Sequence, residues 1–435
     1  MSDLLIQPIP GPFTATITPP GSKSLTNRAL VLAALSDGAC ELTNVLFADD
    51  TRVMLDNLQK LGFDVTIDEP ARRVRVVGAA GKIPASNAEL FCGNSGTTIR
   101  FLTALCTLGK GTFVLDGIER MRQRPIGALT AMLKNLGARA GHSPEAEGFP
   151  PVQVEAHGLA GGILRYGNEA SSQFLSAILM VAPYAKHEVR VDLEPKQTSW
   201  PYIAMTMQLM DHFQVTAELI RDPKTGEPKQ IIVPHGVYQA TDCEIEPDAS
   251  NATYFLAAAA VSPGSKVTVE RLGKQSMQGD VGFADVLHRM GAGLMFGKDF
   301  ITITGVDELE GVDVNLNGMP DTAQTLAVVA LFAKGPTTIR GLHTLRVKET
   351  DRLAALQNEL TKLGAEAEIE GDVLTVNPPE DGKLKAAKIE TYDDHRMAMS
   401  FAVAGTRSGG VTIKDVECVG KTYPGFFADL ERLRG

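Results

Sequence analysis

Aromatic residues, positive charge and paired cysteines are all scarce in this sequence, and each shortage excludes a class of protein. Aromatic residues make up 6% of the 435 residues and include a single Trp, which leaves little surface for stacking nucleic-acid bases. The formal net charge of −10 disfavours nonspecific binding to nucleic acid or to an acidic membrane. Any basic binding site in such a chain must therefore be local, with cations drawn from distant segments.

The five cysteines show neither a disulfide framework nor a metal site. Their number is odd, their spacing is wide, and no Cys-x-x-Cys or Cys/His group occurs. We therefore expect reduced thiols in a cytoplasmic protein. The first residues lack a basic region followed by an apolar core, so we expect no targeting signal. No uncharged apolar run reaches the length of about 18 residues that would predict a membrane span.

A short phrase, Leu/Met-Gly-Ala/Phe, recurs at a spacing of about 75 residues. Each glycine predicts the left-handed end of an amphipathic helix. Alternating segments such as 73–77 and 300–304 predict strands. The spacing fits the chain nearly six times, which predicts an α/β protein of six units grouped in two domains. The marker positions are Gly62, Gly137, Gln214 in a degraded copy, Gly291 and Gly364.

The segment Gly21-Ser-Lys-Ser-Leu-Thr-Asn-Arg28 runs directly into an apolar helix over 29–35. Backbone N–H groups at a helix start are free and carry partial positive charge. With a lysine, an arginine and hydroxyl side chains added, this start favours a bound anion such as phosphate. The simpler alternative is a serine-capped helix with two solvated cations.

The same design recurs at 94–100, 122–126, 171–173, 319–322, 346–352 and 393–397. Pro125 is expected in the first turn of a helix, with Arg124 at its positive end. Segment 346–352 interleaves acids with cations, as proton transfer beside a bound anion requires, and 393–397 places a His and an Arg at the entrance of an apolar helix. For Asp321 the alternative is a simple helix cap, and for His395 a structural histidine. Convergence of these segments predicts one or two small, highly anionic substrates.

These motifs resemble the 5-enolpyruvylshikimate-3-phosphate synthase family of enolpyruvyl transferases, in order and over essentially the whole chain. The resemblance implies an α/β fold of two similar domains, each of three βαβαββ units in an inside-out α/β barrel, with the active site in the inter-domain cleft. We expect one domain over residues 22–245, carrying the main contacts to shikimate 3-phosphate. A discontinuous domain should cover 1–21 plus 246–435. The motifs lie at 21–28, 93–97, 124–127, 171–174, 276–280, 346–352 and 394–399.

The resemblance implies transfer of the enolpyruvyl group of phosphoenolpyruvate to the 5-hydroxyl of shikimate 3-phosphate. Phosphate leaves from a tetrahedral intermediate by addition and elimination. No metal and no organic cofactor is implied. The expected partners are the two small substrates, without nucleic acid or membrane, and the expected state is a monomer. Two phosphates and two carboxylates must be neutralised in such a site.

The same resemblance assigns residues by motif. Asp321 would be the general base for the 5-hydroxyl and Glu349 the proton donor to C3 of phosphoenolpyruvate, with Lys23 and His395 also catalytic. The residues expected to bind shikimate 3-phosphate are Lys23, Ser24, Arg28, Ser171, Ser172, Gln173, Ser199, Tyr202, Asp321, Thr344 and Lys348. Those expected to bind phosphoenolpyruvate are Lys23, Asn94, Gly96, Arg124, Gln173, Arg352, Arg396 and Lys421.

Three positions depart from the family pattern: Phe101 stands where many members have Pro, Trp200 where many have Lys, and Thr344 where many have Asn. Gly96 favours sensitivity to glyphosate, a mimic of phosphoenolpyruvate, because a side chain there would crowd the pocket. Two alternatives remain open. One is a UDP-N-acetylglucosamine enolpyruvyl transferase, although the loop Cys usual in that family is missing from 120–125. The other is a non-catalytic anion-binding module on the same scaffold.

Overall fold

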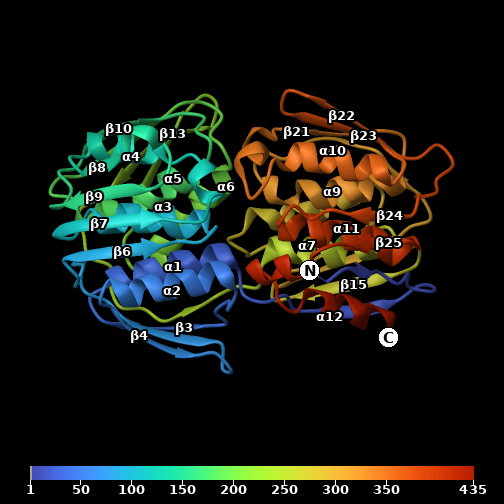
Figure 1. Ribbon diagram of the computed structural model, residues 1–435, viewed down its shortest axis with the longest axis horizontal. Helices are drawn as coiled ribbons and strands as arrows, with labels where there is room; N and C mark the ends of the chain where they lie inside the picture. The colour runs from blue at the N-terminus through green and yellow to red at the C-terminus, as the bar shows by residue number, and fades with distance from the viewer. Residues whose placement is uncertain (1) are drawn as a thin grey trace. The chain divides into compact units, whose positions relative to one another are not determined.

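The computed structural model describes residues 2–435, which divide into two compact units. One unit consists of Met1–Pro20 and Glu246–Gly435, and the other is the continuous segment Gly21–Ile245. Figure 1 shows that each unit combines sheets with helices. Among residues 2–435, no helix combines the length and apolar character that crossing a membrane requires.

The Gly21–Ile245 unit contains three four-stranded sheets of one design. Each sheet has one parallel pair of strands, and a second helix leads into two antiparallel strands; in the second and third copies a helix also joins the two parallel strands. The middle copy comprises β6 (Asn87–Phe91), α3 (Gly96–Cys106), β7 (Gly111–Asp116), α4 (Gly127–Asn135), β8 (Arg139–His142) and β9 (Val152–Ala156). The next comprises β10 (Gly162–Tyr166), α5 (Gln173–Val181), β11 (Val189–Leu193), α6 (Trp200–His212), β12 (Glu218–Arg221) and β13 (Pro228–Val233).

The first copy in this unit is completed from the far end of the segment. Its continuous part comprises α1 (Lys23–Leu35), β3 (Ala39–Thr43), α2 (Asp49–Lys60), β4 (Asp64–Asp68) and β5 (Arg73–Val77). The missing parallel strand is β14 (Cys243–Glu244), which pairs with β3. A hydrogen bond of 2.8 Å from Asn44 Nδ2 to the Ile245 carbonyl closes the copy.

The other unit repeats this design with two strands from the start of the chain. Its first copy comprises β2 (Thr14–Ile17), α7 (Ala249–Ala260), β15 (Lys266–Glu270), α8 (Phe283–Arg289), β16 (Gly293–Phe296) and β17 (Phe300–Thr304). Its second comprises β19 (Asp313–Asn315), α9 (Ala323–Val329), β21 (Thr337–Arg340), α10 (Arg352–Lys362), β22 (Glu366–Glu370) and β23 (Val373–Asn377). The last comprises β24 (Ala387–Ile389), α11 (His395–Arg407), β25 (Val411–Ile413) and α12 (Phe426–Glu431), closed by β1 (Leu4–Leu5).

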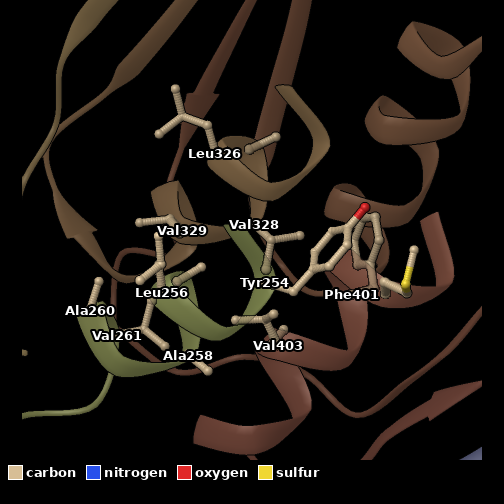
Figure 2. Packing of buried hydrophobic residues seen from close by; sticks show 14 of the residues in the cluster. Tyr254, Leu256, Ala258, Ala260, Val261, Leu326, Val328, Val329, Phe401 and Val403 are labelled. Carbon is tan, nitrogen blue, oxygen red and sulfur yellow. The ribbon is translucent and has the colours of Figure 1, made fainter. Parts of the chain in front are cut away.

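The first helix of each copy is buried almost completely, and its polar residues are buried with it, among them Asn27 and Arg28 of α1 and His395 and Arg396 of α11. Every residue of α7 and α9 is buried, and so is α11 as far as Thr406. Figure 2 shows Leu256 of α7, Val328 of α9 and Phe401 of α11 in one hydrophobic core. The second helices are amphipathic instead. On α10 and at its end, the predicted face of Leu353, Leu356, Leu360 and Leu363 is buried.

The repeat predicted from the glycine phrase is confirmed. The φ angles are +87° at Gly62, +91° at Gly137, +110° at Gly291 and +98° at Gly364, all left-handed. Gln214 of the degraded copy also has a left-handed φ of +66°. The strands predicted at 73–77 and 300–304 are β5 and β17. The α/β fold class is therefore confirmed, with three copies in each half: five copies contain a four-stranded sheet, and the last contains the three strands β1, β25 and β24.

Candidate active site

The first turn of α1 presents a lysine next to a buried carboxylate. Ser22 is the N-cap, and its Oγ accepts a hydrogen bond from the Leu25 amide at 3.4 Å. Lys23 is the first helical residue, and its side chain is 13% exposed. Its Nζ lies 3.3 Å from Oδ2 of Asp50, whose side chain is 4% exposed. This contact holds the ammonium of Lys23 in one position.

Arg28 lies one turn further along α1 and is buried. Its Nε donates to Thr206 Oγ1 at 2.7 Å, and its Nη2 donates to Ser176 Oγ at 3.1 Å and to the Tyr202 carbonyl at 3.3 Å. Its Nη1 donates to the Ser24 carbonyl at 2.9 Å. Burial lowers the pKa of Arg28 to about 10, so it remains charged at neutral pH. Arg28 therefore ties α1 to α5 and α6 with a buried positive charge.

Arg124 approaches the start of α3 rather than a helix of its own. Its Nη1 donates to both the carbonyl and Oδ1 of Asn94, at 2.8 and 3.1 Å. A Cβ added at Gly96, the first residue of α3, would lie 2.7 Å from Arg124 Nη2 and 3.2 Å from Arg100 Nη1. The glycine is therefore what allows two guanidinium groups to approach this helix start.

The helix start predicted at Pro125 is wrong. A 3-10 turn, η1 (Met121–Gln123), precedes Arg124, and α4 (Gly127–Asn135) begins two residues after the proline. The Pro125 carbonyl instead accepts a hydrogen bond of 3.0 Å from Arg100 Nη2. Proline suits the first turn of a helix but does not require one. Here Pro125 lies in a loop that contains Arg124 and accepts a hydrogen bond from Arg100.

The start of α5 is oriented by the same Arg100. Its Nη1 donates to Gln173 Oε1 at 2.6 Å, and a guanidinium cannot accept a hydrogen bond in return. The Gln173 amide is therefore oriented with its N–H₂ group available to another acceptor. Ser171 Oγ accepts from the Gln173 backbone amide at 3.2 Å, and Ser172 is the buried N-cap residue.

Ser199 and Tyr202 belong to the start of α6. Ser199 is the N-cap and has a left-handed φ of +50°, and Lys196 before it has φ +64°. Non-glycine residues are held in this region at some strain, which concentrates at functional loops. The Tyr202 amide donates to the Ser199 carbonyl at 3.0 Å, which fixes the turn.

Hydrogen bonds join the starts of α1, α3 and α5 to one another. Asn27 Nδ2 of α1 donates to Thr97 Oγ1 of α3 at 2.7 Å. Arg100 joins α3 to α5 through Gln173, and Arg28 joins α1 to α5. We call the predicted residues at these starts and at the start of α6 the α1 cluster. It comprises Lys23, Ser24, Arg28, Asn94, Gly96, Arg124, Ser171, Ser172, Gln173, Ser199 and Tyr202.

In the other unit, Asp321 is surrounded by cations. It lies in the 3-10 turn η5 (Pro320–Thr322) before α9. Its Oδ1 is 3.4 Å from Lys348 Nζ and 3.1 Å from Arg352 Nη1, and its Oδ2 is 2.9 Å from Arg396 Nη2. Thr322, not Asp321, is the N-cap residue of α9. Helix capping alone therefore does not account for this carboxylate.

Arg352 links three carboxylates at the start of α10. Its Nε is 2.7 Å from Asp394 Oδ2, and its Nη2 is 2.8 Å from Glu349 Oε2, in addition to the contact with Asp321. Its side chain is 1% exposed. Burial lowers the pKa of Arg352, but the charges of Asp394, Glu349 and Asp321 together raise it by more. The net shift is therefore upward, and Arg352 stays charged. Lys421 Nζ lies 3.9 Å from Glu349 Oε1 and extends the group.

Of two further predicted residues, His395 lies beside these contacts and Thr344 precedes Lys348 in the chain. His395, the first residue of α11, is fully buried, with Nδ1 3.7 Å from Asp394 Oδ1. Thr344 lies buried in the turn η7 (His343–Val347), and its Oγ1 has no hydrogen-bond partner within residues 2–435. We call the whole group the Asp321 cluster. It comprises Asp321, Thr344, Lys348, Glu349, Arg352, Asp394, His395, Arg396 and Lys421.

Sequence reasoning did not single out several residues that complete these clusters. Asp50 lies in the first turn of α2, where an acid suits the helix dipole, so nothing pointed to Lys23. Asp394 stands in a noted segment, but its pairing with Arg352 depends on how α10 meets α11. Asp280 of the 276–280 motif is buried against Ser250 Oγ. Burial and, secondly, the charge of Asp321 together raise its pKa to about 6.

Comparison with known proteins bears on what these clusters do. The EPSP synthase (3-phosphoshikimate 1-carboxyvinyltransferase) family model matches residues 8–430. A 3-phosphoshikimate 1-carboxyvinyltransferase of Sulfurovum sp. (strain NBC37-1) is 46% identical over 417 residues, 95% of each chain. A chloroplastic one of Brassica napus is 45% identical, over 99% of this chain and 85% of that protein.

Solved structures give the same answer. An EPSP synthase from Acinetobacter baumannii superposes with a TM-score of 0.80 and 27% identity, over 99% of this chain and 98% of that chain. The enolpyruvyl transferase NikO from Streptomyces tendae, at 16% identity and a TM-score of 0.75, shares the fold. These matches favour the EPSP synthase family over the alternative of a UDP-N-acetylglucosamine enolpyruvyl transferase. The chain therefore belongs to the EPSP synthase (3-phosphoshikimate 1-carboxyvinyltransferase) family, as its motifs predict.

Proposed function

We propose that the chain transfers the enolpyruvyl group of phosphoenolpyruvate to the 5-hydroxyl of shikimate 3-phosphate, releasing phosphate, and that the α1 and Asp321 clusters carry this reaction. Relatives named for this activity are 41–46% identical along nearly the whole chain. The two compact units would be the two domains of the family.

The α1 cluster would hold shikimate 3-phosphate. Free N–H groups at the starts of α1 and α5 suit a phosphate dianion, and the hydroxyls of Ser24, Ser171 and Ser172 add donors. Lys23 would exchange part of its contact with Asp50 for the incoming phosphate. Gln173 would present the N–H₂ group that Arg100 leaves available. The remaining expected contacts are Arg28, Ser199, Tyr202, Asp321, Thr344 and Lys348.

Arg28 has a specific requirement in this assignment. Its guanidinium already donates to two hydroxyls and two carbonyls. A direct contact with the substrate needs one hydroxyl partner, such as Ser176, to be exchanged for a substrate oxygen. Even without that exchange, its buried charge attracts an anion to the α1 start, because burial weakens screening by solvent.

Phosphoenolpyruvate would be held by buried cations. Arg124, Arg352, Arg396 and Lys421 are each less than 9% exposed, and burying so many cations is unfavourable unless they bind anions. In the Asp321 cluster, internal carboxylates supply part of that charge. The Gly96 amide at the start of α3 and Asn94 would complete the contacts with the carboxylate and phosphate of the substrate.

The carboxylates divide the proton transfers. Asp321 would take the proton of the 5-hydroxyl as that oxygen bonds to C2 of phosphoenolpyruvate, while Glu349 gives a proton to C3. Lys348 would hold the developing alkoxide, and Lys23 the phosphate. In the second step C3 returns a proton to Glu349 and the C2–C3 double bond re-forms, while phosphate leaves from C2 and takes the proton held by Asp321. His395 would support this centre through Asp394.

The single observation that carries this proposal is Asp321, with three cations within 3.4 Å of its two carboxylate oxygens. The test is a phosphate-release assay with both substrates, repeated with each omitted. Release only with both together supports the proposal. Release with UDP-N-acetylglucosamine in place of shikimate 3-phosphate would favour the alternative transferase, and binding without release would favour the non-catalytic module.

We also infer a cytoplasmic monomer. Support comes from the acidic net charge and from the reduced state expected of the five cysteines, four of which are buried. Light scattering on a sizing column measures the state, and a mass of twice 46.5 kDa at working concentration would refute the monomer.

A further inference from the structure

We propose that Glu359 is a positioning residue that sets Arg352 and Arg396 at the spacing phosphoenolpyruvate requires. The inference rests on the proposed binding role of these two arginines. Glu359 lies in the second half of α10, and no motif or resemblance assigned it a role. Its side chain is 0% exposed, an unfavourable place for a carboxylate unless its oxygens are satisfied.

Both oxygens of Glu359 are satisfied, and most of their partners lie just before α11. Oε1 accepts from Tyr392 Oη at 2.7 Å and from Lys362 Nζ at 2.8 Å. Oε2 accepts from the Glu390 backbone amide at 3.1 Å and from Lys362 Nζ at 2.7 Å. Lys362 belongs to α10 itself, so the contacts that reach another element are those with Glu390 and Tyr392.

The segment held by Glu359 has an unusual backbone. Tyr392 and Asp393 have left-handed φ angles of +55° and +53° in succession, and neither is glycine. L-residues enter this region only against a steric penalty, so the surrounding contacts must hold them there. Asp394 follows directly as the N-cap of α11, and its Oδ1 accepts from the Arg396 backbone amide at 2.9 Å.

Helix α10 therefore holds the entry to α11 at two points along its length. At its first residue, Arg352 pairs with Asp394. Two turns later, Glu359 holds Glu390 and Tyr392. The second contact fixes where the left-handed turn lies, and hence where α11 starts. Since Arg396 is the second residue of α11, its position relative to Arg352 depends on Glu359.

A structural role alone makes a different prediction. If Glu359 only fastened α10 to its neighbour, its loss would lower stability without distinguishing between the two substrates. If it sets the spacing of the two arginines, its loss acts on phosphoenolpyruvate, because recognition of a small anion by two guanidinium groups falls steeply with displacement. Shikimate 3-phosphate, assigned mainly to the α1 cluster, should be affected much less.

The experiment measures both Michaelis constants in the Glu359→Gln variant. Glutamine keeps the shape of the side chain but has one acceptor oxygen, so it cannot accept from both Tyr392 Oη and the Glu390 amide as the carboxylate does. We expect KM for phosphoenolpyruvate to rise about tenfold and KM for shikimate 3-phosphate to stay within about twofold. Tyr392→Phe removes one of the contacts at a partly exposed position and should shift the same constant by a smaller factor.

Gln357→Ala is the matched control. Gln357 lies on the same helix, and its Nε2 donates to the Ala367 carbonyl at 2.9 Å, away from the entry to α11. It should lower the melting temperature without changing either KM. Equal changes in both constants, or none, in a folded Glu359→Gln variant would overturn the inference. If the Glu359→Gln variant does not fold, the inference is overturned when Tyr392→Phe changes KM for both substrates equally or changes neither. An inactive wild type would overturn the proposed function, and this inference with it.

Discussion

Replacing Gly96 by alanine tests whether Arg124 binds phosphoenolpyruvate. The added methyl would lie 2.7 Å from Nη2 and 3.1 Å from Cζ of Arg124. Ordinary contact between such atoms is about 3.5 Å, so the guanidinium must withdraw by roughly 0.8 Å. Its bonds to the Asn94 carbonyl and Oδ1, at 2.8 and 3.1 Å, would have to rearrange with it.

The expected effect is on substrate binding rather than on folding. A displacement approaching 1 Å at a binding group lowers the rate or affinity by about tenfold to a hundredfold, so KM for phosphoenolpyruvate should rise by that factor. Stability should change little, because Gly→Ala in a helix contributes about 0.4–1 kcal/mol that offsets the cost of moving a flexible arginine. KM for shikimate 3-phosphate should stay nearly constant.

Steady-state kinetics with each substrate varied in turn, together with a melting curve, measures these effects. Gly141→Ala is the control, because a Cβ there meets nothing within 4 Å and the position lies in β8. An unchanged KM for phosphoenolpyruvate in Gly96→Ala would refute the reasoning that Arg124 contacts this substrate. A large fall in melting temperature would instead show that the two arginines at this helix start cannot move.

Three further changes test the carboxylates. Asp321→Asn should lower kcat by about 10²–10⁴-fold, the usual contribution of a general base, with shikimate 3-phosphate binding largely kept in calorimetry. Glu349→Gln should collapse turnover in the phosphate-release assay and leave shikimate 3-phosphate binding nearly intact; full activity would remove its role. Burial, and secondly the charge of Asp321, raises the pKa of Asp280 to about 6, above its unfolded value, so the folded state loses stability as this group ionises. Relative to Asp280→Asn, wild-type unfolding free energy should fall by about 2 kcal/mol as the pH rises from about 4 to 7, measured by urea titration; a difference independent of pH would contradict the shift.

The sequence was sufficient for the repeat because the repeat is local. A glycine after an amphipathic helix marks a left-handed stop wherever it occurs, and the helix face before Gly364 needed only its own leucines. The buried helices could be recognised in the same way, from apolar runs such as 29–35 and 174–180. Their polar first turns stood out against that background, which is why the candidate segments could be found.

The partners within the clusters could not be predicted from the sequence. Asp50 meets Lys23 only because α2 packs beside α1, and Asp394 meets Arg352 only because α10 packs beside α11. No spacing along the chain encodes either contact. The helix start predicted at Pro125 was wrong for a related reason. Proline does prefer the first turn of a helix, but here a tertiary hydrogen bond from Arg100 to the Pro125 carbonyl holds this residue in a loop. Glu359 would have been read as an ordinary solvent-facing helix acid.

Strands β1, β2 and β14 each complete a copy formed mainly by a distant part of the chain, and they set the order in which a newly synthesised chain can fold. Within Gly21–Ile245, the last partner needed is β14, so this half can close once Ile245 has left the ribosome. The two strands at the start of the chain pair later, because β2 needs β15, and Leu4 of β1 needs Ile413 of β25, to have been synthesised. Until then the nascent chain has a folded Gly21–Ile245 unit, while strands β1 and β2 before it lack their partners and the segment after it is incomplete. That interval exposes strand edges to chaperones or to aggregation, and its length is fixed by topology rather than by stability.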